Sequence, residues 1–161
     1  MPDCMREMDA RGLRPAVLAA AQSRPFLGIC IGLQMLFESS DEGDVLGLAV
    51  LAGRVRRFPP REAMRDRMGV RLKVPHMGWN QVRQRNAHPL WSGIEDGTRF
   101  YFVHSYYAQV GDEQIVSGVS DYGLSFTCAV AQDNIFAVQF HPEKSHTAGL
   151  RLLSNFVDWN R

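Results

Sequence analysis

The chain has 161 residues, which fits a single domain spanning residues 1–161. Its formal net charge of +1, with 22% charged residues, argues against a nucleic-acid-binding or membrane-surface protein. No apolar stretch approaches the roughly 20 residues of a membrane helix, and the three cysteines lack metal-ligand spacing, so we expect a cytoplasmic protein without metal or cofactor.

The first residues predict two helices. Asp3 is placed to cap a helix that ends near Gly12. Pro15 fits the first turn of a second helix, residues 16–22, because proline is tolerated there. The expected apolar face of the first helix consists of Cys4, Met5 and Met8.

A strand and a third helix are predicted next. Pro25 separates the second helix from residues 26–30, an apolar run typical of a buried strand. The helix that begins near Ile31 is expected to end in the polar run 39–43, and its apolar stripe is Leu33, Leu36 and Phe37. This succession of helix, strand and helix favours an α/β fold with a parallel sheet.

The remainder of the chain is richer in strands. Strand candidates separated by Gly, Pro and Asp are residues 51–58, 73–82, 100–103, 115–119, 126–132 and 135–140. Asp133-Asn134 predicts a tight turn between the last two, and therefore an antiparallel hairpin. Residues 59–68 are expected to form a surface loop. A terminal helix is predicted over residues 147–159, with an apolar stripe of Leu150, Leu153 and Val157.

Cys30 is the candidate nucleophile. It lies at a strand-to-helix junction, which strains the backbone and projects the side chain, and Gly28 and Gly32 are expected to relieve the crowding. The helix start places its positive dipole end beside the sulfur and so favours the thiolate. A lone cysteine in an apolar run is more often a small buried hydrophobe, but the glycine spacing and the junction favour a nucleophile.

The apolar run 135–140 ends in His141-Pro142-Glu143. Glu143 is placed to accept a hydrogen bond from one ring nitrogen of His141, which leaves the other nitrogen to exchange a proton with Cys30. A histidine at a strand end is more often structural or exposed. Together with the cysteine, however, this pair completes a nucleophile, a base and a group that orients the base.

These motifs resemble a known enzyme family. Residues 28–34, Gly-Ile-Cys-Ile-Gly-Leu-Gln, and 141–143, His-Pro-Glu, resemble the class I (triad) glutamine amidotransferases. Residues 75–80 (Pro-His-Met-Gly-Trp-Asn), 100–106 (Phe-Tyr-Phe-Val-His-Ser-Tyr) and 140–145 (Phe-His-Pro-Glu-Lys-Ser) are similar to the family's glutaminase subunits that serve a separate cyclase. The resemblance covers essentially the whole chain and implies a flavodoxin-like α/β fold with a mixed, mainly parallel sheet flanked by helices.

The resemblance also implies a mechanism. Cys30 would attack the side-chain amide of L-glutamine and form a γ-glutamyl thioester. His141 would protonate the departing ammonia and later activate water, with Glu143 holding its ring. The N–H of Ile31 would supply one oxyanion donor. The substrate-binding positions that the resemblance implies are Gly28, Gln34, Glu38, His104, Ser105 and Tyr106.

The implied partner is a (βα)₈ cyclase subunit that forms a heterodimer with this chain and receives the ammonia. Tyr101 and Lys144 match positions at the mouth of the ammonia passage, and Trp79 matches the docking surface. The plain alternatives are that Tyr101 and Trp79 are core aromatics and that Lys144 is a solvated charge. No nucleic acid or membrane partner is expected.

The resemblance also points to a shortened N-terminus. In a domain of this class, roughly 40 to 50 further residues precede the position that Met1 matches. They include two strands and a Pro-Gly-x-Gly-type loop that supplies the second oxyanion donor, and loss of one such donor costs on the order of 10²–10³ in rate. Three hypotheses follow: a glutaminase serving the cyclase, a glutaminase serving another synthase, and a cyclase-binding module of weak or no activity.

Overall fold

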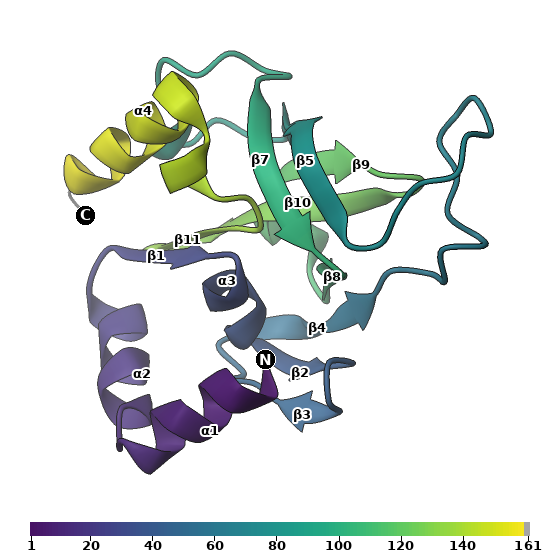
Figure 1. Ribbon diagram of the computed structural model, residues 1–161. Coiled ribbons are helices and arrows are strands. Elements are labelled where there is room, and N and C mark those ends of the chain that lie inside the picture. The colour runs from purple at the N-terminus through teal and green to yellow at the C-terminus, as the bar shows by residue number, and fades with distance from the viewer. Residues whose placement is uncertain (160–161) are drawn as a thin grey trace.

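The computed structural model describes residues 1–159 as a nine-stranded sheet, a separate two-stranded ribbon and helices on both sides of the sheet (Figure 1). The helices are α1 (Pro2–Ala10), α2 (Arg14–Ser23), α3 (Ile31–Met35) and α4 (His146–Val157), with 3₁₀ turns η1 (Pro89–Trp91), η2 (Glu113–Ile115) and η3 (Pro142–Lys144). The strands are β1 (Phe26–Ile29), β2 (Phe37–Ser40), β3 (Val45–Leu46), β4 (Leu51–Arg57), β5 (His76–Gln81), β6 (Arg83–Gln84), β7 (Arg99–His104), β8 (Tyr106–Val110), β9 (Val116–Asp121), β10 (Ser125–Gln132) and β11 (Ile135–Val138).

The sheet is mixed, as predicted, but it is not mainly parallel. Its main path runs β1-β11-β10-β8-β4-β2-β3, with β9 beside β10 and β6 beside β9, while β5 and β7 form the ribbon. Among the described strands, only β1–β11 and β2–β4 pair in parallel. The other described pairs are antiparallel, and they include three hairpins, β2–β3, β9–β10 and β10–β11, in which a short turn joins neighbouring strands.

Strand β11 separates two hydrophobic clusters. Ile135 and Ala137 pack into a cluster with α1, α2 and α3, whereas Phe136 and Val138 pack into a second cluster with Leu152 of α4. In Figure 1, β1 and β11 lie between α4 above and α2 and α3 below. All four β11 residues are buried, so this strand is covered on both faces and is a rigid base for the segment that follows.

The predicted hairpin is confirmed. Strands β10 and β11 pair antiparallel around Asp133-Asn134, and Asp133 adopts a positive φ of 51°. The Asn134 side chain donates to the carbonyl oxygen of Ala21 at 2.8 Å, so the turn is also anchored to α2. This fixes where β11 begins and therefore where its carboxyl end lies.

The first two helices form where the sequence predicts them, with one correction at the first cap. Asp3 lies inside α1, whose N-cap is Met1, and its side chain makes no capping bond. Met5 and Met8 are buried, but Cys4 is exposed and does not share their face. Pro15 occupies the first turn of α2 as expected.

Helix α3 is shorter than predicted. It ends at Met35, and the chain continues as β2, which pairs in parallel with β4. Leu36 and Phe37 are both fully buried, so their burial was anticipated but their helical backbone was not. The β4 backbone accounts for the difference, because it offers β2 a ladder of hydrogen bonds and the Gly53 N–H donates to Glu38 Oε2 at 2.9 Å.

Helix α4 forms as predicted, but it buries a different face from the one expected. Leu150 and Val157 are 62% and 82% exposed, whereas Leu152 and Gly149 are buried. The buried face is therefore displaced by about one residue from the predicted stripe. The reason is Gly149, which packs against the backbone of η3 without a side chain.

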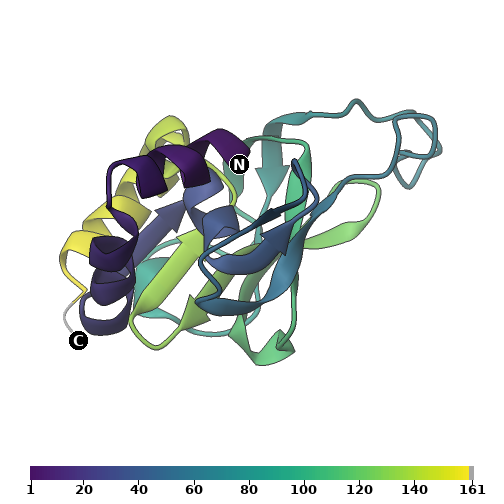
Figure 2. The same ribbon diagram turned by 90° about the horizontal axis from the view of Figure 1, so that it is seen from below.

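The segment 58–75 projects from the body as a long loop, which Figures 1 and 2 both show. It contains the predicted surface loop 59–68 and shortens the strand expected over residues 73–82, since β5 begins only at His76. Within residues 1–159, no helix is long and apolar enough to cross a membrane.

Candidate active site

Cys30 lies in the strained junction that the sequence predicts. It follows β1, precedes α3 and adopts φ 52° and ψ −106°, a region that non-glycine residues rarely occupy. Its N–H donates to the carbonyl oxygen of Val138 at 2.8 Å. The junction is therefore held against β11.

Of the two glycines expected to relieve crowding, only Gly28 does so. A Cβ built on Gly28 would lie 2.9 Å from Ala137 Cβ and 3.0 Å from the Gly32 carbonyl oxygen. A Cβ on Gly32 would meet nothing within 4 Å. Gly28 thus permits the close approach of β1, β11 and α3, which is a different role from contacting a substrate.

The expectation that the junction favours the Cys30 thiolate is wrong for this structure. Burial raises the pKa of the Cys30 thiol, and the carboxylates of Glu143 and Glu42 raise it further. The Ile31 N–H and the Gln139 side chain lower the pKa by hydrogen bonding, but burial is the largest effect. Helix α3 has only five residues, so its dipole is small.

His141 follows β11 after two fully buried residues, Gln139 and Phe140. Because β1 and β11 are parallel neighbours, Cys30 and His141 leave the sheet at the same edge. His141 Nδ1 and Glu143 Oε1 lie 2.6 Å apart, so the predicted contact of the orienting carboxylate is present. His141 Nε2 is buried and has no hydrogen-bond partner among the described residues, which leaves it available to a proton on another molecule or on the thiol.

Ser145 ties the His141 segment to the ribbon. Its buried hydroxyl accepts from the Tyr101 N–H at 3.0 Å and donates to the His141 carbonyl oxygen at 2.6 Å. The His141 N–H in turn donates to the Tyr101 carbonyl oxygen at 2.9 Å. Three hydrogen bonds therefore fix the histidine backbone against one residue of β7.

Gln34 is a buried residue that reaches the candidate nucleophile only through Gln139. It is 4% exposed, and its amide nitrogen donates to the Tyr106 carbonyl oxygen at 3.2 Å and to Gln139 Oε1 at 3.0 Å. Both of its N–H groups are therefore engaged within the protein. Its expected contact with substrate stays a prediction.

Glu38 points to the sheet, and Glu42 is, after Glu143, the second carboxylate whose charge raises the pKa of Cys30. Glu38 belongs to β2 and bonds the β4 backbone, whereas the charge of Glu42 reaches Cys30. Glu42 Oε2 also forms a 2.7 Å ion pair with the α-ammonium group of Met1. Sequence reasoning missed Glu42 because it lies in the polar run that was assigned only to end a helix.

His104 and His76 form a buried neutral pair beside the site. The Tyr106 carbonyl oxygen, 2.7 Å from His104 Nδ1, can only accept, so His104 carries its proton on Nδ1. His104 Nε2 then accepts from His76 Nδ1 at 2.9 Å. Burial is the main reason that the pKa of His104 is lowered to about 4. Burial, together with the charge of His104, lowers the pKa of His76 to about 3. Ser105 and Tyr106 follow directly and are half-buried.

This histidine pair predicts loss of stability in acid. Because the folded-state pKa values lie below the ordinary 6.5, their contribution is complete above pH 6.5 and declines as the pH falls toward the folded pKa. We expect the free energy of unfolding to fall more steeply below pH 6.5 in the parent than in His76→Asn, which retains a donor to His104. The difference by about pH 4.5 should be about 2–3 kcal/mol. Urea unfolding across this range measures it, and equal slopes would contradict the assignment.

The expected partner-contact residues lie along one side of the ribbon and η3. Trp79 is 42% exposed, faces Tyr101 across the β5–β7 register and stacks on His146 with 4.9 Å between ring centroids. Trp79 is therefore not a core aromatic, while Tyr101 is half-buried. Lys144 is exposed in η3 and forms no salt bridge with any part of the chain that the structure describes.

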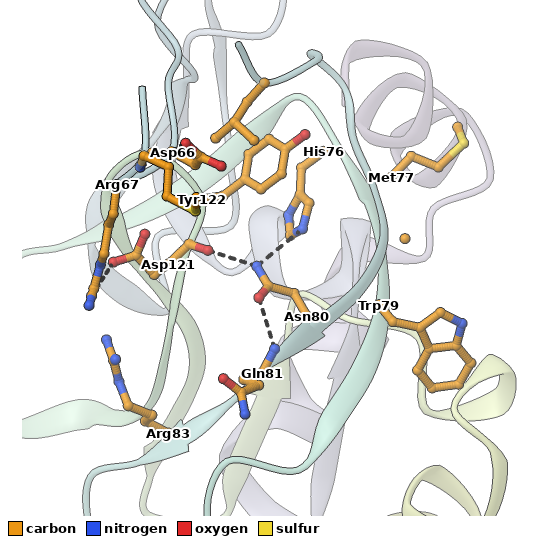
Figure 3. Close-up of a pocket in the computed structure, with 14 residues that line it drawn as sticks. Asp66, Arg67, His76, Met77, Trp79, Asn80, Gln81, Arg83, Asp121 and Tyr122 are labelled. Carbon is orange, nitrogen blue, oxygen red and sulfur yellow. Dashed lines mark hydrogen bonds and ion pairs between the residues drawn. The ribbon is translucent and has the colours of Figure 1, made fainter. Parts of the chain in front are cut away.

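A cavity of about 470 Å³ lies beside β5 but away from the catalytic residues (Figure 3). Its lining includes His76, Asn80, Asp121 and Tyr122 and excludes Cys30, His141 and Glu143. Figure 3 shows Trp79 projecting from the opposite side of β5. Within residues 1–159, no group of three or more His, Cys, Asp or Glu residues is arranged to hold a metal ion.

Comparisons with known proteins agree with this geometry. A family model described as "Glutamine amidotransferase class-I" matches residues 6–159. The chain is 67% identical over 159 residues to the imidazole glycerol phosphate synthase subunit HisH of Dechloromonas aromatica, covering 99% of this chain and 73% of that protein. It is 65% identical over 158 residues to the same subunit of Thiobacillus denitrificans, covering 98% and 69%. A crystal structure of a glutamine amidotransferase from Thermotoga maritima matches with a TM-score of 0.58 and 20% identity, over 98% of this chain and 55% of that one, and so supports the fold.

Proposed function

Because this chain belongs to the class-I glutamine amidotransferase family, within the branch of HisH subunits, we propose that it is the glutaminase subunit of an imidazole glycerol phosphate synthase. In this proposal it hydrolyses L-glutamine to glutamate and ammonia. The ammonia passes to a (βα)₈ cyclase subunit of the HisF type, which uses it to form imidazole glycerol phosphate and AICAR in histidine biosynthesis. The observation that carries the proposal is Cys30 at a strained junction beside the parallel strand that leads to His141 and Glu143.

The chemistry proceeds in two halves. His141 takes the proton of the Cys30 thiol as the sulfur bonds to the amide carbon of glutamine, and the carbon–nitrogen bond breaks as His141 gives that proton to the leaving ammonia. His141 then takes a proton from water, which attacks the thioester and releases glutamate and the thiol. Glu143 supports the charged ring at 2.6 Å, and the Ile31 N–H, which already bonds the sulfur, is placed to donate to the oxyanion.

The substrate site is proposed around the same junction. His104, Ser105 and Tyr106 contribute the chain segment beside Gln34, and Gly28 keeps the junction compact. Glu38 remains the acidic residue proposed to bind the amino-acid end of glutamine, and the charge of Glu42 also reaches Cys30. A cytoplasmic location belongs to the same proposal, since Cys30 has to remain a free thiol.

The partner is proposed to dock on the exposed side of the ribbon. Trp79 offers a half-exposed aromatic ring, and Met77 beside it is 61% exposed. Tyr101 and Lys144 lie next to the His141 segment, where ammonia would leave. A large aromatic residue surrounded by polar groups is the usual anchor of such an interface.

The test combines this chain with a cyclase subunit of the HisF type from a similar synthase. We expect glutamate release that rises when the cyclase and its ligand are added, and Trp79→Ala should weaken cyclase binding about tenfold or more. Met68→Ala is the matched control, because Met68 is a highly exposed methionine on the projecting loop.

Each other result counts against a defined part of the proposal. Cyclase binding without glutamate release would favour the binding-module hypothesis over the enzyme. Activation by an unrelated synthase but not by the cyclase would favour a different partner. Equal binding by Trp79→Ala and Met68→Ala would remove the ribbon as the docking surface.

A further inference from the structure

A buried glutamine contacts the candidate nucleophile and has no part in the chemistry described so far. Gln139 directly follows β11, is fully buried, and places its Nε2 3.7 Å from Cys30 Sγ. Its backbone N–H donates to the Cys128 carbonyl oxygen at 2.8 Å, so the sheet fixes its position. A polar side chain buried at this depth needs partners that justify its presence.

The hydrogen bonds determine which end of the Gln139 amide faces the sulfur. The Tyr106 carbonyl oxygen accepts from Gln34, so the Gln34 atom beside it must be the amide nitrogen. That same nitrogen lies 3.0 Å from Gln139, where only an oxygen can accept its second hydrogen. Gln139 therefore presents its oxygen to Gln34 and its N–H to Cys30, and neither amide can be reversed without bringing two donors or two acceptors together.

We propose that Gln139 is a further catalytic residue that donates its amide N–H to the Cys30 thiolate, and that Gln34 is a positioning residue that orients it. The inference rests on Cys30 acting as the nucleophile. A thiolate formed at this half-buried position is partly shielded from water and has two carboxylates near it, those of Glu42 and Glu143. The donors that face it are the Ile31 N–H and the Gln139 amide.

The arrangement also explains why the donor has to be an amide. A neutral N–H stabilises the anion without carrying a charge that would have to be neutralised in the buried site. The carboxylates whose charges act on the sulfur are those of Glu143 in η3 and Glu42 after β2. Gln139 is thus a fixed, uncharged donor beside two acidic groups.

The experiment measures the reactivity of Cys30 and needs no turnover of glutamine. In a Cys4→Ser background, the alkylation rate by iodoacetamide is followed against pH, since Cys128 is fully buried. Gln139→Met removes the donor with little change of shape. We expect alkylation near pH 7 to slow about tenfold, equivalent to a rise of about one unit in the apparent pKa of Cys30, with an unchanged rate at high pH.

Two further variants separate this role from simple loss of packing. Gln34→Leu leaves Gln139 in place but removes its orientation, and should slow alkylation at neutral pH by a smaller factor. Ser117→Ala removes another buried hydrogen bond, that of Trp91 Nε1 at 2.9 Å, and should leave the pH profile unchanged.

An unchanged pH profile in a folded Gln139→Met protein would overturn the proposal, as would equal effects of Gln139→Met and Ser117→Ala. If Gln139→Met does not fold, Gln34→Leu decides, and a parental profile there counts against the proposal. Failure of the glutaminase assay with a normal alkylation result would instead count against the proposed function.

Discussion

Cys30→Ala is expected to abolish glutamine hydrolysis, with a loss on the order of 10⁴-fold or more. In the proposed mechanism the Cys30 sulfur forms the thioester, and residues 26–35 contain no other thiol, hydroxyl or amine. The measurement is glutamate release in the presence of the cyclase. Cys4→Ala serves as the matched control, because Cys4 is an exposed thiol on α1 and should leave the rate unchanged.

A third variant guards against misreading an unfolded protein as an inactive one. Cys30 holds a positive φ of 52°, which glycine adopts freely. Cys30→Gly should therefore be inactive yet more stable than Cys30→Ala by about 1 kcal/mol. Residual activity in either variant would exclude the thioester mechanism, and equal stability would mean that the junction stores no strain.

Gly149→Ala is expected to damage both stability and activity. A Cβ at this position would overlap the Pro142 carbonyl oxygen and lie 2.9 Å from Ser145 Cβ. Both neighbours belong to the segment that follows His141, the candidate base, so η3 would have to move. We expect a loss of about 3 kcal/mol in the free energy of unfolding and a decrease in kcat on the order of 10²-fold from misplaced groups.

The expected loss of stability is opposite in sign to the usual effect of alanine in a helix. Glycine to alanine inside a helix normally stabilises by about 0.5–1 kcal/mol, so a loss identifies the contact with η3 as the cause. Ser154→Ala places alanine on the exposed face of the same helix and should be neutral. Urea unfolding together with steady-state kinetics tests both variants, and a stabilised or fully active Gly149→Ala would contradict the structure.

The catalytic strands could be read from the sequence because their signals are local. The β1 run and the Cys30 junction are marked by glycines, and β11 is marked by a turn before it and His-Pro-Glu after it. Parallel pairing then brings both strand ends to one edge. The contact between His141 and Glu143 could be predicted because the two residues are only two positions apart in the chain.

The predictions that failed concern features that depend on contacts between residues far apart in the chain. Leu33, Leu36 and Phe37 satisfy helical spacing, but the β4 ladder converts the last of them to a strand. Strand β8 was missed because only Ser105 separates it from β7. In α4, Gly149 gives no hydrophobic signal although it makes the closest packing.

The electrostatics of the site could not be predicted either. Burial of Cys30 raises the pKa of its thiol, and burial is a property of the complete fold. Gln139 did offer a signal, since a glutamine inside an otherwise apolar run has to find partners when it is buried. The identity of those partners, Cys30 and Gln34, depends on elements about a hundred residues away.

The Ser145 connection has a mechanical consequence for the spacing of the two catalytic groups. The Cys30 backbone is bonded to Val138 in the large sheet, whereas the His141 backbone is bonded to Tyr101 in the ribbon. Nucleophile and base are therefore bonded to different sheets, which residues 139–140 join along the chain and a shared core around Phe102 and Phe136 joins in space. A displacement of Trp79 would therefore reach the His141 backbone by way of Tyr101, its neighbour across the β5–β7 register.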